Sequence, residues 1–419
     1  STWKQGLYAP GTRIPVVGAD MLAKQPPDYV LILAWNYARH IMDKYPHIKN
    51  FIIPVPKPIV LGNVVDQDMY RIAEALGETA KELAGRTVLI TGGSGVLGSY
   101  LVASLEFLNK NVLEQPCKVI SVDNFLIAKK KNLVKDIDET HITFKMHDVC
   151  VPMRLHEQVD YIISAAGVAS PIYYKRFPIE TIDGTTIGVK NMLELAREKR
   201  VKSLLYFSSS EIYGDPDPKH VPTPETYRGH VSSLGPRACY DESKRLGETL
   251  CVTYHQVYQV PVKIVRPFNV YGPGMSPADH RAIPSFFSKG FEGQPLHVYG
   301  GGGQTRTFCY ISDATVGFLK ILLSEPNGEV YNVGNDAGEI DMNGLANEIV
   351  TNVFDNKITA QLSEYPNQYP QDEPQRRCPD LTKIRTQLHY NPSVELRTGL
   401  KRMALWFAEC IGKPYPLNK

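Results

Sequence analysis

Residues 87–98 read TVLITGGSGVLG, an apolar run that passes directly into a glycine-rich segment and then into a helical pattern. Small residues let a backbone approach a pyrophosphate, and the N-terminus of the following helix offers N–H donors to it. A glycine triplet alone is weak evidence, but here the preceding strand and the following helix are both present, as the motif requires. We therefore predict a dinucleotide site at Gly92, Gly95, Val96, Leu97 and Gly98.

A second apolar strand at 118–122 ends at Asp123, which lies 25 positions after Gly98. A carboxylate at that point binds ribose hydroxyls and would repel a 2′-phosphate. The pattern therefore favours NAD over NADP, although the run Lys129, Lys130 and Lys131 leaves NADP open.

Further strand-like stretches follow at 142–148, 161–166 and 204–208. Strands that alternate with helical patterns predict an α/β fold, a Rossmann-type doubly wound parallel sheet, and ligands bind at the carboxyl ends of such strands. The remaining residues expected to touch the cofactor are Asn124, Phe125, Asp148, Val149, Ala165, Ala166 and Gly167.

The stretch from Phe207 to Lys244 carries the candidate chemistry. It opens FSSSEIYGDP, which places Ser209, Ser210 and Glu211 at the end of a strand. It closes with Tyr240 and Lys244, whose spacing puts a phenol and an ammonium on one face of a helix. A lysine beside a phenol favours the ionised form, so we expect Tyr240 to act as a base nearer neutrality than its usual pKa of ~10 allows.

Composition excludes several classes of partner. The net charge of +2 marks neither a nucleic-acid nor a membrane-surface partner, and no apolar run is long enough to span a bilayer. Seven scattered cysteines without a CxxC pair indicate a reducing compartment, hence a cytoplasmic protein, and argue against a metal site or a disulfide framework.

Residues 1–80 form a separate, βαβ-like extension. We expect a fully buried strand at 29–35, a helix at 36–45, a strand at 51–55 and a helix at 66–84. A unit this small cannot cover both faces of its own sheet, so it must pack on something else. The sequence of this extension resembles the carboxy-terminal end of nucleotide-sugar C-methyltransferases, which implies a fused or associated C-methyltransferase domain. The alternative is an extension of the next domain that is specific to this protein.

From about Arg86 to Ala408 the chain resembles the extended short-chain dehydrogenase/reductases that act on nucleotide sugars. Within that family it is most similar to the UDP-glucuronate decarboxylases. The motifs that carry the resemblance are VDNF (122–125), ASPIYY (169–174), SSSEIYGDP (208–216), GHVSSLGPRACYDESKRLGET (229–249), RPFNVYGPGM (266–275), PLHVYGGGGQTRTFCYISD (295–313) and RRCPDL (376–381).

The resemblance implies a role for each matching residue. Ser209, Tyr240 and Lys244 form the catalytic triad, with Tyr240 taking the proton of the sugar C4 hydroxyl. Glu211 and Arg306 serve the chemistry at C5. The residues expected to bind the substrate are Tyr174, Ser210, Asn269, Arg281, Tyr299, Arg306 and Arg377.

The resemblance also implies the domain plan and the assembly. Residues 81–275 are the NAD-binding domain, to which 304–335 return, and residues 276–303 and 336–419 build a smaller substrate-binding lobe. The helices at 186–198 and 240–258 are expected to form a four-helix bundle in a homodimer.

The expected reaction is transient oxidation of the sugar at C4. A C5 carboxylate becomes a β-keto acid once C4 is a ketone, so CO2 can leave, and the same cofactor then returns its hydride. The pair Ser210-Glu211 is the decarboxylase pattern, because family 4,6-dehydratases have an aspartate before the glutamate.

Three departures leave other readings open. Where these decarboxylases usually have lysine and two asparagines, this chain has Asp183, Thr185 and Tyr173, and acids near a sugar disfavour an anionic substrate. The alternatives are a 4-epimerase or 4-ketoreductase of a branched-sugar pathway and, in another class, a non-catalytic NAD-binding scaffold.

Overall fold

The computed structural model describes residue 5, residues 7–9, 14–54, 58–127, 133, 137–365 and 374–416. The chain divides into two compact units, Ser1–Gln67 and Asp68–Lys419, with the division inside helix α3 (Val64–Leu76). Lys129, Lys130 and Lys131 lie outside the described residues.

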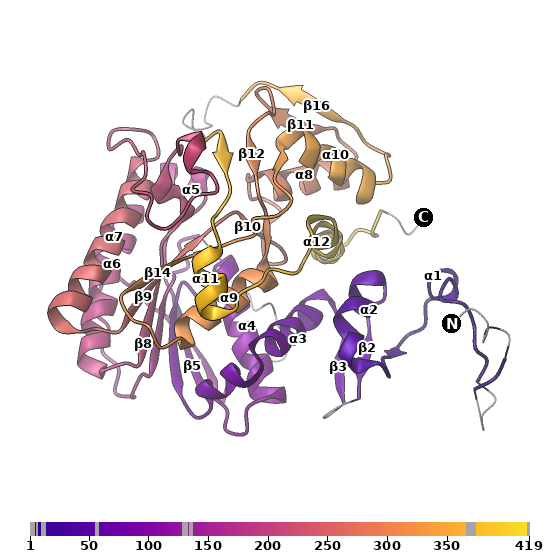
Figure 1. Ribbon diagram of the computed structural model, residues 1–419, viewed down its shortest axis with the longest axis horizontal. Helices are drawn as coiled ribbons and strands as arrows, with labels where there is room; N and C mark the ends of the chain where they lie inside the picture. The colour runs from indigo at the N-terminus through magenta and orange to yellow at the C-terminus, as the bar shows by residue number, and fades with distance from the viewer. Residues whose placement is uncertain are drawn as a thin grey trace. The chain divides into compact units, whose positions relative to one another are not determined.

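The larger unit is built on a seven-stranded sheet in which every neighbouring pair is parallel (Figure 1). Its order is β14-β9-β8-β7-β4-β5-β6. The chain starts in the middle at β4, fills one side with β5 and β6, and returns to fill the other side from β7. This reversal between β4 and β7 is the switch point at which doubly wound sheets bind ligands, and the predicted Rossmann-type α/β fold is confirmed.

Five strands of this sheet, β4 to β8, occupy the predicted stretches, whereas β9 and β14 were not predicted. Their bounds are β4 Thr87–Thr91, β5 Lys118–Asp123, β6 Ile142–Met146, β7 Tyr161–Ser164, β8 Ser203–Phe207, β9 Val262–Pro267 and β14 Glu329–Val333. β4, β7 and β8 are buried along nearly their whole length, as expected of parallel strands covered on both faces.

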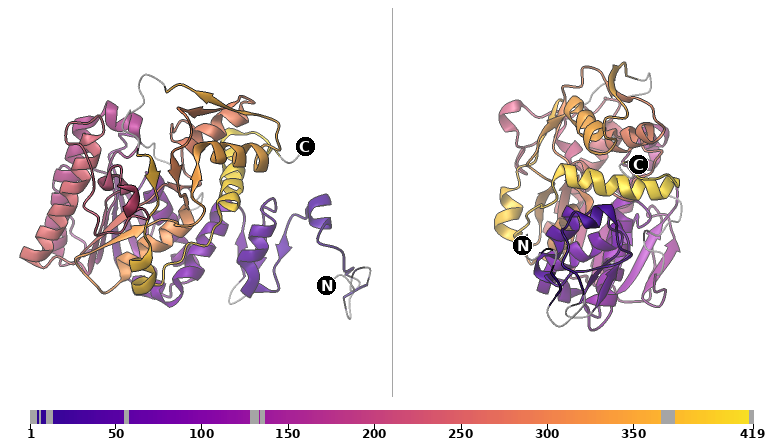
Figure 2. Two further views of the ribbon diagram at one scale, coloured as in Figure 1. Left: turned by 45° about the horizontal axis from the view of Figure 1, so that its top comes forward. Right: turned by 90° about the vertical axis from the view of Figure 1, so that its right-hand side faces the viewer.

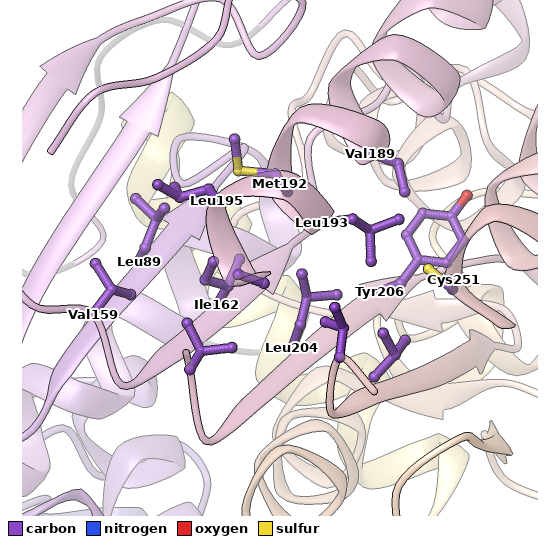
Figure 3. Packing of buried hydrophobic residues seen from close by; sticks show 14 of the residues in the cluster. Leu89, Val159, Ile162, Val189, Met192, Leu193, Leu195, Leu204, Tyr206 and Cys251 are labelled. Atoms are coloured by element: carbon purple, nitrogen blue, oxygen red, sulfur yellow. The ribbon is translucent and has the colours of Figure 1, made fainter. Parts of the chain in front are cut away.

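Helices cover both faces of the sheet. α4 (Val96–Asn111) packs with α9 (Ile311–Leu323), and α6 (Pro178–Lys199) packs along α7 (Ala238–Tyr258), with α6 and α7 lying side by side in Figure 1. The layer between the sheet and α6/α7 is a dry core in which Leu89, Ile162 and Leu204 meet Met192 and Leu193 (Figure 3).

The remaining elements of this unit lie between or after these strands in the sequence. They are α5 Pro171–Arg176, η4 Ser210–Tyr213, η5 Pro218–His220, β10 Val270–Tyr271, α8 Ala282–Phe291, β11 Leu296–Tyr299, β12 Thr305–Arg306, β13 Cys309–Tyr310, β15 Ile340–Asp341, α10 Met342–Asn352, β16 Ala360–Ser363, β17 Arg376–Arg377, α11 Thr382–Leu388 and α12 Leu396–Ile411. β11 pairs with β16, β12 lies between β15 and β17, and α10 packs on α8, α12, β11 and β16 (Figure 2).

The smaller unit contains α1 (Met21–Lys24), η2 (Trp35–Tyr37), α2 (Ala38–Lys44) and the strands β1 (Val30–Leu31), β2 (Phe51–Ile53) and β3 (Ile59–Leu61). β1 and β2 are parallel with α2 between them in sequence, which confirms the βαβ-like unit, and β3 adds an antiparallel strand that was not predicted. The expected helix at 66–84 is present as α3 followed by the 3-10 segment η3 (Gly77–Leu83).

The prediction of a fully buried strand over residues 29–35 was wrong. Only Val30–Leu31 pair as a strand, and the side chains of Tyr29, Leu31 and Leu33 are more than half exposed. The register aligns Leu31 with Ile52 and Ile52 with Val60 on one face of the sheet. Leu31 and Val60 on that face are 52% and 56% exposed, so it is not covered along its length.

In the described part of the chain, no helix combines the length and the apolar character needed to cross a membrane. The same residues contain no group of three or more His, Cys, Asp or Glu side chains placed to hold a metal ion.

Candidate active site

The glycine-rich turn between β4 and α4 is as tight as its sequence suggests. Gly92 has a φ of +70°, and a Cβ there would lie 2.8 Å from the Cα of Ala166. A Cβ on Gly98 would lie 2.1 Å from the carbonyl oxygen of Gly92, so only glycine fits. Gly95 is the N-cap of α4, and Val96 and Leu97 form its first turn, whose N–H groups are available to a phosphate.

Asp123 stands at the end of β5 with both carboxylate oxygens engaged. One accepts a hydrogen bond from the Ser94 N–H at 3.0 Å and the other from the Phe125 N–H at 2.9 Å. Phe125 has a φ of 55°, and the Asn124 side chain accepts from the Leu126 N–H, so the loop folds back on itself. The carboxylate is therefore held beside the glycine turn, where a ribose would meet it.

The other predicted cofactor residues lie at the ends of the neighbouring strands. The Thr91 hydroxyl accepts from the N–H groups of Ala165 and Ala166, at 3.1 Å each, which joins the ends of β4 and β7. Asp148 accepts from the Cys150 N–H at 2.9 Å, and Val149 is buried against Gly188 of α6.

Gly167 links this edge to α7. A Cβ on Gly167 would lie 3.3 Å from the Lys244 ammonium nitrogen, so the cofactor loop and the YxxxK helix are adjacent.

Burial raises the pKa of the Cys150 thiol to about 12, and the carboxylates of Asp148 and Asp183 act in the same direction. The structure thus places Asp183 near the Asp148–Cys150 segment.

Tyr240 and Lys244 lie on α7 near the carboxyl end of β8. The Lys244 ammonium donates to the Phe207 carbonyl at 2.7 Å and lies 5.8 Å from the centroid of the Tyr240 ring. The Tyr240 ring stacks on Tyr174 of α5, with centroids 5.4 Å apart and planes 14° from parallel. Ser209 bonds the Tyr240 phenol, and its hydroxyl also accepts from the Glu211 N–H at 3.2 Å.

The expected lowering of the pKa of Tyr240 by Lys244 is wrong for this structure. Burial raises the pKa of Tyr240 to about 12, and the hydrogen bond with Ser209 opposes that rise without cancelling it. Burial also lowers the pKa of Lys244 to about 8. The physical reason is that the ammonium is directed at the Phe207 carbonyl while both groups are desolvated.

Glu211 is the centre of the charged part of the site. Its carboxylate accepts hydrogen bonds from both terminal nitrogens of Arg377 and from Arg237. Burial alone would raise the pKa of Glu211, but the two guanidinium groups outweigh it and lower the pKa to about 2. Glu211 is therefore ionised, and it cannot act as the general acid at C5 while both arginines hold it.

Arg237 and Asp241 were missed in the sequence. Arg237 is the N-cap residue of α7, and Asp241 lies in the first turn beside Tyr240, with its Oδ2 3.4 Å from the Arg237 Nε. Burial raises the pKa of Asp241 to about 7, and the charge of Glu211 acts in the same direction. Their spacing from Tyr240, three residues before it and one after, is the one sequence signal that could have identified them.

Arg306 is placed differently from the expectation. Its guanidinium donates to the carbonyls of Thr305 at 2.8 Å and Pro374 at 2.6 Å, and so supports the backbone near β17. It lies opposite Arg377 in the pairing of β12 with β17, and its charge helps to lower the pKa of Glu211. It reaches the site electrostatically, whereas Arg377 is in contact with Glu211.

The remaining substrate candidates lie around this centre. Arg281 bonds Asp279, and its charge opposes the rise in the pKa of Tyr240. Ser210 is buried at the start of η4. Asn269 donates to the Thr307 carbonyl at 2.9 Å. Tyr299 stacks on Tyr365 with centroids 5.8 Å apart, a contact within the β11/β16 region rather than with Tyr240.

Comparison with protein families gives two matches. Residues 88–334 match the NAD dependent epimerase/dehydratase family. Residues 1–56 match the C-methyltransferase C-terminal domain, in agreement with the resemblance of the N-terminal extension.

Similar proteins include UDP-glucuronic acid decarboxylases of plants and animals. UDP-glucuronic acid decarboxylase 5 of Arabidopsis thaliana is 40% identical over 316 residues, which cover 75% of this chain and 87% of that protein. UDP-glucuronic acid decarboxylase 1 of Xenopus tropicalis is 38% identical over 322 residues, 77% of this chain and 72% of that protein.

Solved structures share the fold. The epimerase Mth375 of Methanothermobacter thermautotrophicus matches with a TM-score of 0.68 and 25% identity, over 81% of this chain and 97% of its own. The dTDP-glucose 4,6-dehydratase DesIV of Streptomyces venezuelae, solved with NAD bound, matches with a TM-score of 0.68 and 24% identity, over 78% and 98% of the two chains. The chain therefore belongs to the NAD-dependent epimerase/dehydratase family.

Proposed function

We propose that this protein decarboxylates UDP-glucuronate by transient oxidation at C4, giving UDP-xylose or its 4-keto intermediate. The observation that carries the proposal is the convergence of Arg237 and Arg377 on one carboxylate beside Tyr240. Guanidinium groups hold carboxylates through paired hydrogen bonds, so this pair fits the C5 carboxylate of a uronic acid. Asp183 lies near Cys150, whose pKa its charge helps to raise.

The residues present fit NAD: a glycine turn that no side chain can enter, a carboxylate for the ribose at Asp123, and a buried lysine beside the phenol. When bound, NAD accepts a hydride from C4 and later returns it. Tyr240 takes the proton of the C4 hydroxyl and gives it back, with Ser209 bonded to its phenol. A cation brought beside the phenol favours the ionised form, so cofactor binding is expected to oppose the rise that burial causes.

Glu211 gains a proton-carrying role only when its partners change. While both arginines hold it, its pKa is about 2. A substrate carboxylate that takes over Arg377 or Arg237 removes a counter-charge from a buried acid, which raises its pKa. Glu211 thus becomes able to hold a proton for C5 when the sugar is bound.

The assembly and the organisation of the chain belong to the same proposal. Exposed apolar side chains on α6 and α7, among them Ile182, Ile187 and Leu246, support a homodimer formed through these two helices. All seven cysteines are free thiols, which supports a cytoplasmic location. Residues 81–275 with 304–335 would bind NAD, and residues 276–303 with 336–419 would close over the nucleotide sugar.

A second candidate is a 4-epimerase or 4-ketoreductase for branched sugars. The match of residues 1–56 to a C-methyltransferase C-terminal domain favours it, because the resemblance of this extension to nucleotide-sugar C-methyltransferases implies a branched sugar. Incubation of the purified protein with UDP-glucuronate distinguishes the two: we expect release of CO2 and a product of lower mass. No CO2, with turnover of a neutral nucleotide hexose, would favour the second candidate, and retained cofactor with no turnover would favour a scaffold.

A further inference from the structure

Four ionisable side chains form a buried row at the end of β8. Arg377 bonds Glu211, Glu211 bonds Arg237, and Arg237 bonds Asp241. Their side chains are 7%, 17%, 6% and 7% exposed, respectively. With both carboxylates ionised the row is neutral, because it contains two positive and two negative charges.

Asp241 is the least well satisfied member of this row. Its Oδ2 has one long contact of 3.4 Å to the Arg237 Nε, and its buried Oδ1 has no hydrogen-bond partner among the described residues. Glu211, in contrast, has two guanidinium partners on its oxygens. A buried carboxylate with so few donors is the group that most readily becomes neutral.

An incoming uronic acid adds a negative charge to a row that is already balanced. Burying an uncompensated charge is strongly unfavourable, so a group in the row is expected to change protonation when the substrate binds. Glu211 and the substrate would compete for the same two guanidinium groups. Asp241 can relieve the excess by taking a proton from solvent, and Arg237 can then donate to the carboxylates of Glu211 and the substrate.

We propose that Asp241 is a positioning residue that takes up one proton when an anionic sugar binds, so that Arg237 can turn from Asp241 to the substrate carboxylate. This inference rests on the proposed decarboxylation. It goes beyond that function by assigning a residue outside the triad a role in selecting an acidic substrate over a neutral one.

The proton count of the reaction agrees with this role. Loss of CO2 from a carboxylate and protonation of C5 consume one proton overall, and CO2 leaves as a neutral molecule. If the row has taken up one proton at binding and that proton is consumed at C5, the row returns to its starting charge when the product forms.

The charged and titratable groups that face Asp241 come from several elements. Glu211 of η4, Arg237 before α7 and Arg377 of β17 act on its pKa. Tyr240 and Cys239, its neighbours on α7, feel its charge. The pKa of Asp241 is already raised to about 7 without a substrate, so proton uptake near neutrality requires only a modest further rise.

The test measures binding in a Tyr240→Phe background, which stops turnover. Dissociation constants for UDP-glucuronate and UDP-glucose are measured with NAD-loaded protein from pH 6 to pH 9. UDP-glucose has the same nucleotide diphosphate as UDP-glucuronate. Dividing the dissociation constant for UDP-glucuronate by that for UDP-glucose therefore cancels the effect of other titrating groups, such as Lys244, on both constants. Calorimetry in two buffers of different ionisation enthalpy counts the protons taken up and needs no further variant.

We expect the dissociation constant for UDP-glucuronate, divided by that for UDP-glucose, to rise by up to about tenfold per pH unit above pH 7. Close to one proton should be taken up per site above about pH 8, where free Asp241 is ionised, and for UDP-glucuronate only. Asp241→Asn, which mimics the protonated acid, should remove the pH dependence. Glu242→Gln, which removes a half-exposed charge from the same turn of α7, should keep it.

The inference is overturned if Asp241→Asn keeps the pH dependence of the Glu242→Gln control, or if calorimetry counts no proton. Failure of the proposed function looks different, because wild-type protein would then release no CO2 at any pH. If UDP-glucuronate does not bind at all, both are wrong.

Discussion

The Glu211 carboxylate accepts hydrogen bonds from both terminal nitrogens of the Arg377 guanidinium, although 166 positions separate the two residues in the chain. Glu211 follows β8 of the central sheet, and Arg377 lies on β17 beyond it. The pair therefore joins the end of the cofactor-binding sheet to the carboxy-terminal region, and substrate that reaches this carboxylate must meet both.

Replacing Arg377 with Gln leaves one side of a buried carboxylate unpaired. We expect destabilisation of about 2–4 kcal/mol, because bonds to buried charges are costly to leave unmade, and a fall of CO2 release below about a hundredth of wild type. Thermal unfolding and a CO2 assay measure the two effects. Arg376→Gln is the matched control, since Arg376 is 41% exposed and pairs with Glu339, and it should cost no more than about 1 kcal/mol. Equal effects of the two variants would contradict the assignment.

Tyr240→Phe removes the phenol hydroxyl and keeps the ring that stacks on Tyr174. We expect turnover to fall by a factor of about 10²–10⁴, as for loss of a positioned acid–base group, with NAD still bound. Initial rates and the absorbance of bound cofactor are the measurements. Tyr258→Phe, on the exposed end of the same helix, should behave as wild type. Unchanged turnover in Tyr240→Phe would refute the assigned base.

Lys244 is expected to reduce stability at neutral pH. Burial lowers its pKa from 10.5 in the unfolded chain to about 8, which corresponds to roughly 3 kcal/mol against the folded state wherever the lysine is charged in both states. The unfolded state binds more protons between pH 8 and 10.5, so this penalty is complete below pH 8 and disappears as the pH rises to about 10.5.

Lys244→Met should therefore be inactive and yet more stable at pH 7, by on the order of 1–3 kcal/mol after loss of the bond to Phe207. Denaturant unfolding of NAD-free protein at pH 7 and pH 10 measures this gain. Lys190→Met, on the exposed side of α6, controls for the loss of a lysine. A gain that is the same at both pH values would argue against a desolvated ammonium.

Asp68 and Arg402 form another ion pair that is buried from solvent, with 2.7 Å between the Arg402 Nη2 and the Asp68 Oδ1. The hydroxyls of Tyr100 and Tyr310 also donate hydrogen bonds to Asp68. Arg402→Met leaves the buried Asp68 carboxylate without its counter-charge, and we expect destabilisation of about 3–5 kcal/mol. The double variant Asp68→Leu, Arg402→Met should recover a large part of that loss, because neither charge of the pair remains buried. The exposed pair Lys219–Asp217 should contribute less than about 1 kcal/mol. A double variant less stable than Arg402→Met would contradict this account.

The sequence by itself determined the central fold and the cofactor edge. The turn at Gly92–Gly98, Asp123 at the end of its strand and the spacing of Tyr240 and Lys244 are local patterns, and a local pattern constrains the backbone that carries it. The same holds for β4, β7 and β8, whose apolar runs are long enough to identify strands buried on both faces.

Only the tertiary structure decided the charged centre. Arg237 at the start of α7 and Arg377 of β17 reach Glu211 from two separate elements, and Asp241 lies beside Arg237. No spacing in the sequence indicates which carboxylate a given guanidinium will reach. The pKa values depend on burial as much as on partners, and for that reason Tyr240 was expected to be a stronger acid than it is. The β1 strand was misjudged for the same reason: the sequence shows that a residue is apolar, but the surrounding elements decide whether it is covered.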